Sequence, residues 1–416
     1  MEYFDGMRMV DRFEQVQCFS AGELERRWAA VRGVMREQGV DLLLILEGDW
    51  EGYSQWLIGT KDASYIIVPP EGEITAVRGH CLPEKGTSAA DKALRRERLA
   101  SGRSLVPIHP GVRYVECLDA EDLLAHFKSG ARRRIGFIHL ETMRASTRDF
   151  LKGVFPGAEY VDITLAIDPV KATKSPEELR LIRNAIVLHE KVMAALPSII
   201  RPGRTIQEIN NDTAYLAHQL GSGGGVCLLF ALQFGKDEAG PITTHSQIVD
   251  YPERRVERGD RVFMLLESNG IGGHFTAMGR NFILGEPSAE TRRYWDLALK
   301  MQDFAAGMLR PGTCVKEIFD ANIRYIESLG HKTNMQNYLH SLGYVFGERP
   351  YLHDPSETIP LRENMVYLNH PHVRIDRGGD TGRVAYDDLY AIDTYLVTPE
   401  GGKRQNAVPR ELIIIE

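Results

Sequence analysis

Several histidines in the C-terminal half of the chain stand in polar segments where an imidazole could do chemistry. His340 opens a His-x-x-Gly sequence in the segment LHSLGYVFGERP, and Glu348 follows it in the same segment. His245 lies in the polar run TTHSQ, and His370 lies in NHPH. Free imidazole has a pKa of about 6.5, so such side chains can exchange protons near neutral pH, and they also bind metal ions. These residues therefore predict proton-transfer chemistry or a metal site.

Two similar helical units surround these histidines. The segments IIRPGRTIQEI and MLRPGTCVKEI share an Arg-Pro-Gly turn, and each follows a long expected helix, at 176–196 and 288–308. Apolar and β-branched residues predict strands at RVFMLLES, NFILG, MVYLNH and YAIDTYLV. An internal repeat of this kind indicates a pseudo-symmetric α+β domain with a site between its halves.

The first part of the chain is organised differently. A helix is expected after Ser20, because Glu23 follows it with the spacing of a capping box. The apolar strands LLLILEG, ASYIIVPP and RRRIGFIHLE alternate with helical segments, which indicates an α/β domain. Pro169 then interrupts the chain before the next helix. We therefore predict a smaller α/β domain over residues 1–168 and an α+β domain over residues 169–416.

Composition excludes several classes of protein. The chain of 416 residues has a formal net charge of -7, so no overall basic field would attract nucleic acid. Its five cysteines are scattered and lack C-x-x-C spacing, which fits a reducing compartment. No segment reaches the roughly 20 apolar residues of a membrane span, and the N-terminus lacks the pattern of a signal peptide. We expect a cytoplasmic protein with a small-molecule substrate and with no nucleic-acid or membrane partner.

The order of motifs in the C-terminal part resembles the family of creatinase, prolidase, aminopeptidase P and methionine aminopeptidase. The resemblance spans about residues 170–416 and is carried, in this order, by GGHFTAMGR, RPGT, HSLGYVFGERP, ENMVYLNHP and VTPEG. It implies the pita-bread fold, an α+β architecture, for the C-terminal domain. The linker KATKSPEELRLIRNA and the α/β domain before it are similar to creatinase and prolidase. That likeness implies a homodimer in which the N-terminal domain of one subunit lies over the pocket of the other.

The metallopeptidases of this family hold two divalent ions with two aspartates, one histidine and two glutamates. By the resemblance, the aspartate positions fall at Leu266 and Ala277, the histidine position keeps His340, and the glutamate positions fall at His370 and Ile392. Two ions need carboxylates, whose negative charge and bridging oxygens hold them together. With all four carboxylates replaced, the resemblance implies no two-metal centre, and we expect neither a bound metal nor a cofactor.

Glu267 stands one residue after the first aspartate position. A shift of one residue along a strand turns a side chain to the opposite face, so we expect that Glu267 does not readily restore that ligand. The pattern is closer to creatinase, the metal-free enzyme of the family, whose strand resembles GGHFTAMGRNFIL and whose loop also reads His-Ser-x-Gly. That likeness places His245 at the catalytic histidine position. Gly279 and His370 replace two creatinase carboxylates, so creatine is not the expected substrate.

The expected site has a catalytic and a substrate-binding set. The catalytic set is His245, His340 and His370, and the substrate-binding set is His274, Glu267, Glu348, Arg349, His353 and His372. We expect a metal-independent, creatinase-type hydrolase that cleaves a C–N bond in a small polar or zwitterionic compound. His245 would act as general base or general acid, while His340 and His370 orient the substrate and stabilise charge.

Other functions remain open from the sequence. One is a lyase or a mononuclear metal hydrolase, because the imidazoles of His274, His340 and His370 suit zinc or iron. Another is a non-catalytic protein that binds peptide in the same cavity. The histidines that match no motif are expected to be structural: His80, His109, His126, His139, His189, His218 and His331.

Overall fold

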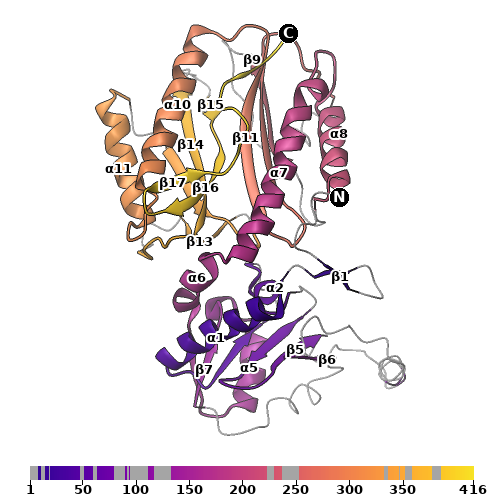
Figure 1. Ribbon diagram of the computed structural model, residues 1–416, viewed down its shortest axis with the longest axis vertical. Coiled ribbons are helices and arrows are strands. Elements are labelled where there is room, and N and C mark those ends of the chain that lie inside the picture. Colours follow the sequence, from indigo (N-terminus) through magenta and orange to yellow (C-terminus); the bar gives the residue numbers. More distant parts are fainter. Residues whose placement is uncertain are drawn as a thin grey trace. The chain divides into compact units, whose positions relative to one another are not determined.

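The structure of the protein is a computed structural model that divides the chain into two compact units, Met1–Lys171 and Ala172–Glu416. The predicted boundary lies between residues 168 and 169. The residues described by the structure are 8–10, 15–17, 19–46, 51–59, 63–78, 90, 93, 111–116, 133–222, 229–236, 253–331, 336–345, 347–351, 358–376 and 386–416. Figure 1 shows the elements of each unit along the chain.

The N-terminal unit is built on a mixed sheet with the strand order β6-β5-β4-β3-β7-β8. Its strands are β3 (Leu42–Ile45), β4 (Tyr65–Val68), β5 (Ile74–Arg78), β6 (Val112–Glu116), β7 (Arg134–Phe137) and β8 (Glu159–Asp162). In the described part of this unit, the helical elements include α1 (Ala21–Glu37), α2 (Tyr53–Ile58), η2 (Leu140–Thr142), α5 (Ala145–Val154) and α6 (Thr164–Ala172), and β1 (Arg8–Val10) pairs with β2 (Gln15–Gln17). Strands β3, β7 and β8 run parallel, which agrees with the predicted α/β domain.

Local sequence explains how this unit begins. The Ser20 side chain accepts a hydrogen bond from the Glu23 backbone N–H at 3.1 Å and so caps α1. Strands β3 and β4 are buried along their whole length, as their unbroken apolar sequences predict. Leu151 of α5 packs with Leu44 and Phe137 against the sheet. The alternation of helix and strand thus buries both faces of the sheet, since Leu43, Ile45, Ile66 and Val68, which have the opposite parity, are buried as well.

The C-terminal unit contains two sheets and two helix pairs in its described residues. The helices are α7 (Pro176–Ile199), α8 (Ile206–Gln219), α10 (Ala289–Met308) and α11 (Val315–Ser328). The first sheet has the order β18-β11-β10-β9, with β9 (Leu229–Lys236), β10 (Asp260–Asn269), β11 (Phe275–Leu284) and β18 (Ile413–Ile415). The second has the order β13-β12-β14-β16-β17, with β12 (Gln336–Ser341), β13 (Glu348–Tyr351), β14 (Val366–Asp376), β16 (Asp393–Thr398) and β17 (Gly401–Arg404); β15 (Tyr386–Tyr390) also pairs with β14.

Both helix pairs follow from the repeated sequence. Ser175 and Thr205 form capping boxes at the starts of α7 and α8, in which each hydroxyl accepts a backbone N–H three residues later. Gly203 and Gly312 occupy the two Arg-Pro-Gly turns with φ values of 88° and 89°, a conformation that favours glycine. Each turn therefore ends one helix of a pair and leads to the next.

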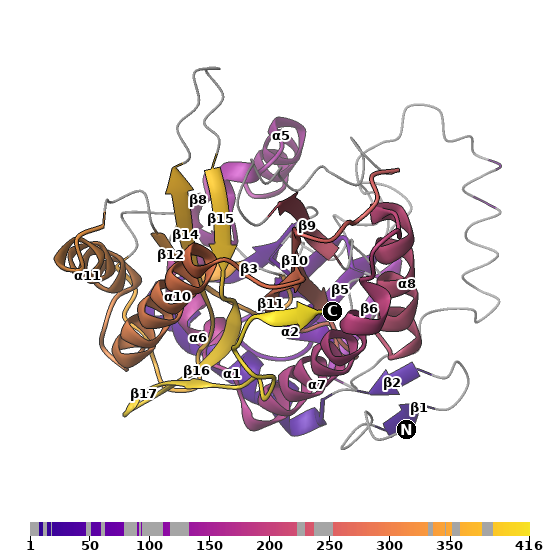
Figure 2. The same cartoon turned by 90° about the horizontal axis from the view of Figure 1, so that it is seen from above.

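The helices cover the outer faces of the two sheets. Figure 2 shows α7 and α8 on one side of the strands and α10 and α11 on the other. Side chains of α7 and α8 pack on one face of the first sheet, and α10 and α11 pack on the second. The other faces of both sheets meet in a cluster that joins Phe263, Leu265 and Ala277 to Leu368 and Ile392. A site between the two sheets must therefore be built from every second residue of each strand, those whose side chains point into this cluster.

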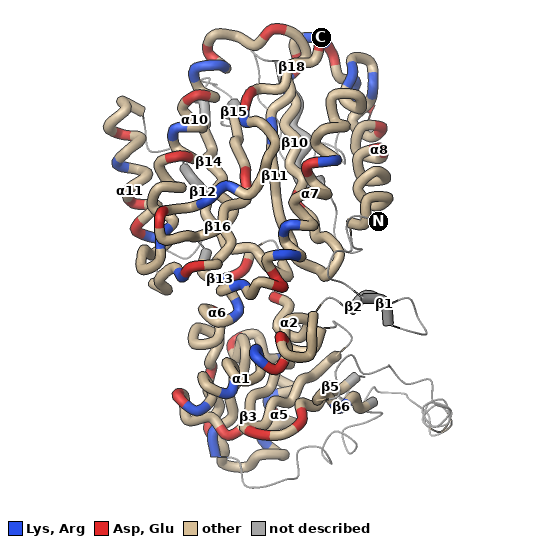
Figure 3. Tube along the Cα trace, in the orientation of Figure 1, with Lys and Arg blue, Asp and Glu red and all other residues tan. Residues whose placement is uncertain are grey.

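Charge is distributed according to these layers. The acidic and basic residues of the C-terminal unit, red and blue in Figure 3, lie mainly on helices and turns, and few lie along the strands. A charged residue on an inner strand face is thus an exception that needs an explanation. No helix in the described parts of the chain is both long enough and apolar enough to cross a bilayer.

Candidate functional site

Most of the described candidate residues share the space between the two sheets of the C-terminal unit. We define the inner layer as this apolar cluster together with Glu267, His340, His370 and His372. Glu267 alternates with Leu265 along β10, on the face that packs in the cluster. On the second sheet, His340 pairs across the strands with Leu368, and His370 and His372 follow Leu368 at every second residue. These side chains therefore point to the same layer.

The register between β10 and β11 corrects one sequence-based prediction. Glu267 lies directly opposite Ala277, the second aspartate position, whereas Leu266 lies opposite Met278. Leu266 and Met278 pack together beneath α7 and α8, while Ala277 packs in the inner layer. The expectation that the one-residue shift turns Glu267 away from the site was therefore wrong. The strand pairing brings Glu267, not Leu266, to the face of Ala277.

Glu267 is a buried carboxyl in apolar surroundings. The residue is 6% exposed, and no hydrogen bond or ion pair reaches its carboxyl group from the residues that the structure describes. Burial raises the pKa of Glu267 to about 8, because loss of water disfavours the charged form. The group is consequently neutral over most of the range below pH 8 and holds a proton that it can donate.

The family's carboxylate positions at Ala277 and Ile392 carry apolar side chains that cannot bind a cation. Ala277 and Ile392 are both fully buried in the inner layer. At Gly279, where creatinase has a carboxylate, an added Cβ would lie 2.9 Å from the Phe263 ring and from Ile392 Cδ1. These positions offer no oxygen ligand, and the creatinase-like carboxylate has no room in this packing.

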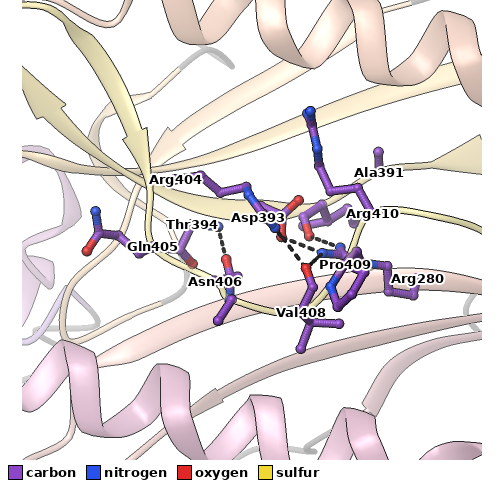
Figure 4. Close-up of polar contacts among 12 residues, drawn as sticks. Arg280, Ala391, Asp393, Thr394, Arg404, Gln405, Asn406, Val408, Pro409 and Arg410 are labelled. Carbon is purple, nitrogen blue, oxygen red and sulfur yellow. Dashed lines mark hydrogen bonds and ion pairs between the residues drawn. The ribbon is translucent and has the colours of Figure 1, made fainter.

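Asp393, the neighbour of the last glutamate position, is bound in an ion pair with Arg280 (Figure 4). Arg280 Nη2 donates to Asp393 Oδ1 at 2.7 Å, and Gln302 Nε2 donates to Oδ2 at 3.2 Å. Arg404 lies 3.6 Å from the same carboxylate. Arg280 also donates to the Pro409 carbonyl at 2.9 Å, so the pair fastens β11 and β16 to the C-terminal segment. This carboxylate serves the fold and is not a ligand for ions in the inner layer.

His340 and His370 bring imidazoles to the inner layer from neighbouring strands. His340 is 9% exposed, and its Nδ1 lies 3.4 Å from the Ser341 carbonyl oxygen. His370 is half-buried and meets Tyr390 edge-on, with 5.3 Å between ring centroids. Both imidazole rings thus belong to the inner layer.

An aromatic stack forms one wall of the inner layer. The His372 ring lies parallel to Tyr390, with a centroid distance of 4.3 Å and an angle of 13°. Tyr390 in turn stacks on Phe263 at 4.8 Å. Such a wall favours flat or apolar parts of a ligand. His372 is therefore placed as a member of this wall. No sequence motif marks Phe263 or Tyr390, although both belong to predicted strands and have the parity of the inner face.

His274 has a structural environment. It is fully buried, its Nε2 lies 3.6 Å from Glu178 Oε1, and its ring centroid lies 4.3 Å from that of Tyr344. Glu178 also caps α7 by accepting the Ser175 backbone N–H at 2.9 Å. His274 therefore links the hairpin between β10 and β11 to the start of α7.

Glu348 is held in a buried ion pair. Its Oε2 accepts a hydrogen bond from Lys174 Nζ at 2.8 Å, and its Oε1 accepts one from the Tyr344 backbone N–H at 2.9 Å. A Cβ on Gly343 would lie only 1.8 Å from Oε1, so glycine is required there. The glycine of the His-x-x-Gly segment thus has a structural role, because the Glu348 carboxylate occupies the space where a side chain at position 343 would lie. Arg349 follows on β13 and is half-buried.

Two predicted residues, His245 and His353, lie outside the described residues, and their roles stay predictions. His189, expected to be structural, has both ring nitrogens engaged: Nε2 is 2.8 Å from Ser268 Oγ and Nδ1 is 3.0 Å from Thr276 Oγ1. Complete burial lowers the pKa of His189 to about 3, so its imidazole is neutral. The structural prediction for this residue is confirmed.

The residues present do not fit the metal sites of the expected family. In the described part of the chain, no three His, Cys, Asp or Glu side chains come close enough to hold a metal ion. His274, His340 and His370 all belong to that part, so the alternative of a mononuclear site from these three residues is not supported. Their separation has a physical reason, because His274 packs with Glu178 and Tyr344 instead of joining the other two rings.

Comparisons with known proteins agree with this architecture. The model of metallopeptidase family M24 matches residues 180–399, just over half of the chain. A Xaa-Pro dipeptidase of Pyrococcus furiosus is 26% identical over 260 residues, 61% of this chain and 69% of that protein. The probable dipeptidase PepE of Mycobacterium bovis is 24% identical over 411 residues, 95% of this chain and 98% of that protein.

A solved structure extends the likeness to nearly the whole chain. The prolidase of Pyrococcus horikoshii OT3 matches with a TM-score of 0.71 at 20% identity, covering 93% of this chain and 100% of that one. The predicted pita-bread fold with its smaller α/β domain is confirmed.

Proposed function

The chain belongs to metallopeptidase family M24, and from its site we propose that it is a hydrolase that cleaves a C–N bond without a two-metal centre. One observation carries this proposal. The inner layer presents the imidazoles of His340 and His370, whereas two of the carboxylate positions hold Ala277 and Ile392. The carboxyl that does face this layer, Glu267, is neutral because burial raises its pKa, so it holds a proton that it can transfer. Proton transfer is therefore the chemistry that this residue set supports best.

Hydrolysis of a C–N bond requires a base that takes a proton from water and an acid that protonates the leaving nitrogen. We propose that His245 takes one of these roles, as its position in the sequence predicts. His340 and His370 orient the substrate and stabilise the charge that develops on it. Neighbouring imidazoles oppose each other's protonation, so the set contains at least one neutral ring at pH 7.

The proposed substrate is a small polar or zwitterionic compound. The relatives named as Xaa-Pro dipeptidases suggest Xaa-Pro dipeptides, whose scissile amide is also a C–N bond, as the first compounds to test. The filled space at Gly279 disfavours creatine. The aromatic wall of Phe263, Tyr390 and His372 suits a substrate with a flat or apolar portion.

The proposal is tested by assaying hydrolysis of Xaa-Pro dipeptides, guanidino acids and zwitterionic amides by mass spectrometry, with and without a chelator. We expect turnover to survive chelation and elemental analysis to find less than one equivalent of transition metal. Two bound equivalents would refute the metal-independent mechanism, and one tight equivalent would favour a mononuclear enzyme with other ligands. Tight peptide binding without turnover would favour the non-catalytic alternative.

Variants separate the imidazole chemistry from general damage to the fold. Replacing His340 with alanine should lower turnover by roughly 10²–10³-fold, the usual contribution of a group that stabilises developing charge. The matched control is His218→Ala, because His218 is an exposed residue of α8, a helix that precedes the inner-layer strands in the sequence. This variant should retain full activity. Equal activity of the two variants would remove His340 from the mechanism.

A further inference from the structure

The proton that Glu267 carries has no role in the proposed function. The Glu267 carboxyl lies on the inner face of β10, directly opposite the methyl group of Ala277. Substrate binding, the role predicted from its sequence, requires no transferable proton. Its position and its neutral form together suggest a different role.

We propose that Glu267 is the catalytic acid of the site and gives its proton to the leaving nitrogen as the C–N bond breaks. This assignment rests on the proposed function, which it deepens by naming the proton donor. It leaves the activation of water to His245, the histidine to which the proposed function gives a role in proton transfer.

The packing around Glu267 explains why its carboxyl is an acid. Directly across the strand pair, Ala277 offers neither charge nor a side-chain hydrogen bond. The Ala277 backbone is itself occupied, because its carbonyl accepts a hydrogen bond from Thr394 Oγ1 at 2.9 Å. An ionised carboxylate in such a place would need a cation or several donors to replace its lost water. The neutral acid needs neither and is therefore the stable form.

Among the residues that the structure describes, the titratable groups that share the inner layer with Glu267 carry no permanent positive charge. They are His340 on β12, His370 and His372 on β14, and the phenol of Tyr390 on β15. The permanent cation on the same face of β10 is Arg261, six residues earlier. At about 3.3 Å per strand residue, its backbone lies on the order of 20 Å away. Burial thus decides the state of Glu267, in agreement with its raised pKa.

The reaction balances with groups of the protein and water alone. An imidazole takes a proton from water as the water oxygen forms a bond to the carbon. The C–N bond breaks, its electron pair stays on nitrogen, and nitrogen takes the Glu267 proton. The imidazolium then returns a proton to the Glu267 carboxylate, directly or through water, so one water is consumed and an amine is released.

The first test needs no substrate. Proteins labelled with ¹³C at the glutamate carboxyl carbons are titrated by NMR, and the Glu267→Gln variant assigns the signal. We expect a midpoint near 8 for Glu267. A midpoint near the ordinary value of about 4.3 would overturn the assignment, because the group would then be ionised at neutral pH and could not act as an acid.

The second test uses a compound that the wild-type protein hydrolyses. Glu267→Gln preserves the size and a hydrogen-bond donor but removes the transferable proton, so kcat should fall by roughly 10²–10⁴-fold with little change in KM. The alkaline limb of the pH–rate profile should vanish with it. Glu267→Asp should recover part of the rate, and Glu327→Gln, on the exposed face of α11, is the matched control that should behave as wild type.

The outcomes separate this assignment from the proposed function. A Glu267→Gln variant with normal kcat, or with a raised KM alone, would overturn the acid role and leave the hydrolase intact. A wild-type protein without turnover on the whole set of compounds would count against the hydrolase itself. In that case the NMR midpoint still decides whether Glu267 is the neutral acid that the geometry indicates.

Discussion

The ion pair between Lys174 and Glu348 should be one of the most sensitive polar contacts of the C-terminal unit. The two side chains are 1% and 2% exposed, and Lys174 Nζ lies 2.8 Å from Glu348 Oε2. Glu348 Oε1 also accepts the Tyr344 backbone N–H. We therefore expect the neutral variants Glu348→Gln and Lys174→Met each to reduce the free energy of unfolding substantially.

The magnitude follows from the burial of both charges. Removing one partner of a buried pair leaves the other charge without its counterion in a medium that solvates it poorly, which costs about 3–5 kcal/mol. The double variant removes both charges together, so its loss should be smaller than the sum of the single losses. Because the two groups touch, a coupling free energy of about 1–3 kcal/mol is expected.

The measurement is a double-mutant cycle from urea unfolding, followed by circular dichroism and by tryptophan fluorescence. Trp295, on α10, lies in the same unit as the ion pair. Agreement of the two probes is required before free energies are compared, because a chain with two compact units need not unfold in one step. The control cycle uses Lys316 and Asp320, an ion pair on α11 whose side chains are 48% and 39% exposed. Its coupling should stay below about 1 kcal/mol.

Additive losses at Lys174 and Glu348 would refute this reasoning. The same conclusion would follow if the buried and the exposed cycles gave equal couplings, since burial would then have no effect on the pair. A large loss in the single variants with full recovery in the double variant would show that the charges are needed only to neutralise each other.

Four further predictions concern protons, packing and assembly. The free energy of unfolding of the wild type should fall by on the order of 4 kcal/mol as pH rises from 4.5 to about 8, because over that range the unfolded chain loses a proton that folded Glu267 keeps. In urea unfolding, the Glu267→Gln variant should not show this decrease with pH. The free energy of unfolding should also fall as pH drops from 6.5 toward about 3, because the unfolded chain binds a proton that folded, buried His189 does not bind. The His189→Gln variant should lose less stability over this acid range in the same assay. Gly343→Ala should lower the melting temperature, since its Cβ would lie 1.8 Å from Glu348 Oε1, whereas Gly347→Ala, with no atom within 4 Å of the added Cβ, should not. Light scattering at micromolar concentration should give the mass of a homodimer, as the creatinase-like order of domains predicts, and a monomer would contradict it.

Local features of this protein were predictable because their contacts join residues close in sequence. Ser175 caps α7 through a residue three positions later, and Thr205 does the same for α8. The glycines of the two Arg-Pro-Gly turns adopt the left-handed conformation that the turn sequence demands. The loss of carboxylates at Ala277 and Ile392 was equally visible, because side-chain chemistry is known once a motif assigns the position. The family and the fold follow from features of this kind.

The direction and partners of the site residues depended on pairing between distant segments. The face of Glu267 is set by its register with β11, so the spacing of motifs alone led to the wrong side of the strand. Lys174 finds Glu348 across 174 residues, and His274 meets Glu178 at the start of α7, contacts that no local pattern encodes. Sequence determines which chemical groups are present, but burial and strand register decide which of them remain charged and which face the substrate. That decision requires both sheets of the C-terminal unit to fold, because Glu267 lies on the face of β10 that packs in a cluster drawn from both of them.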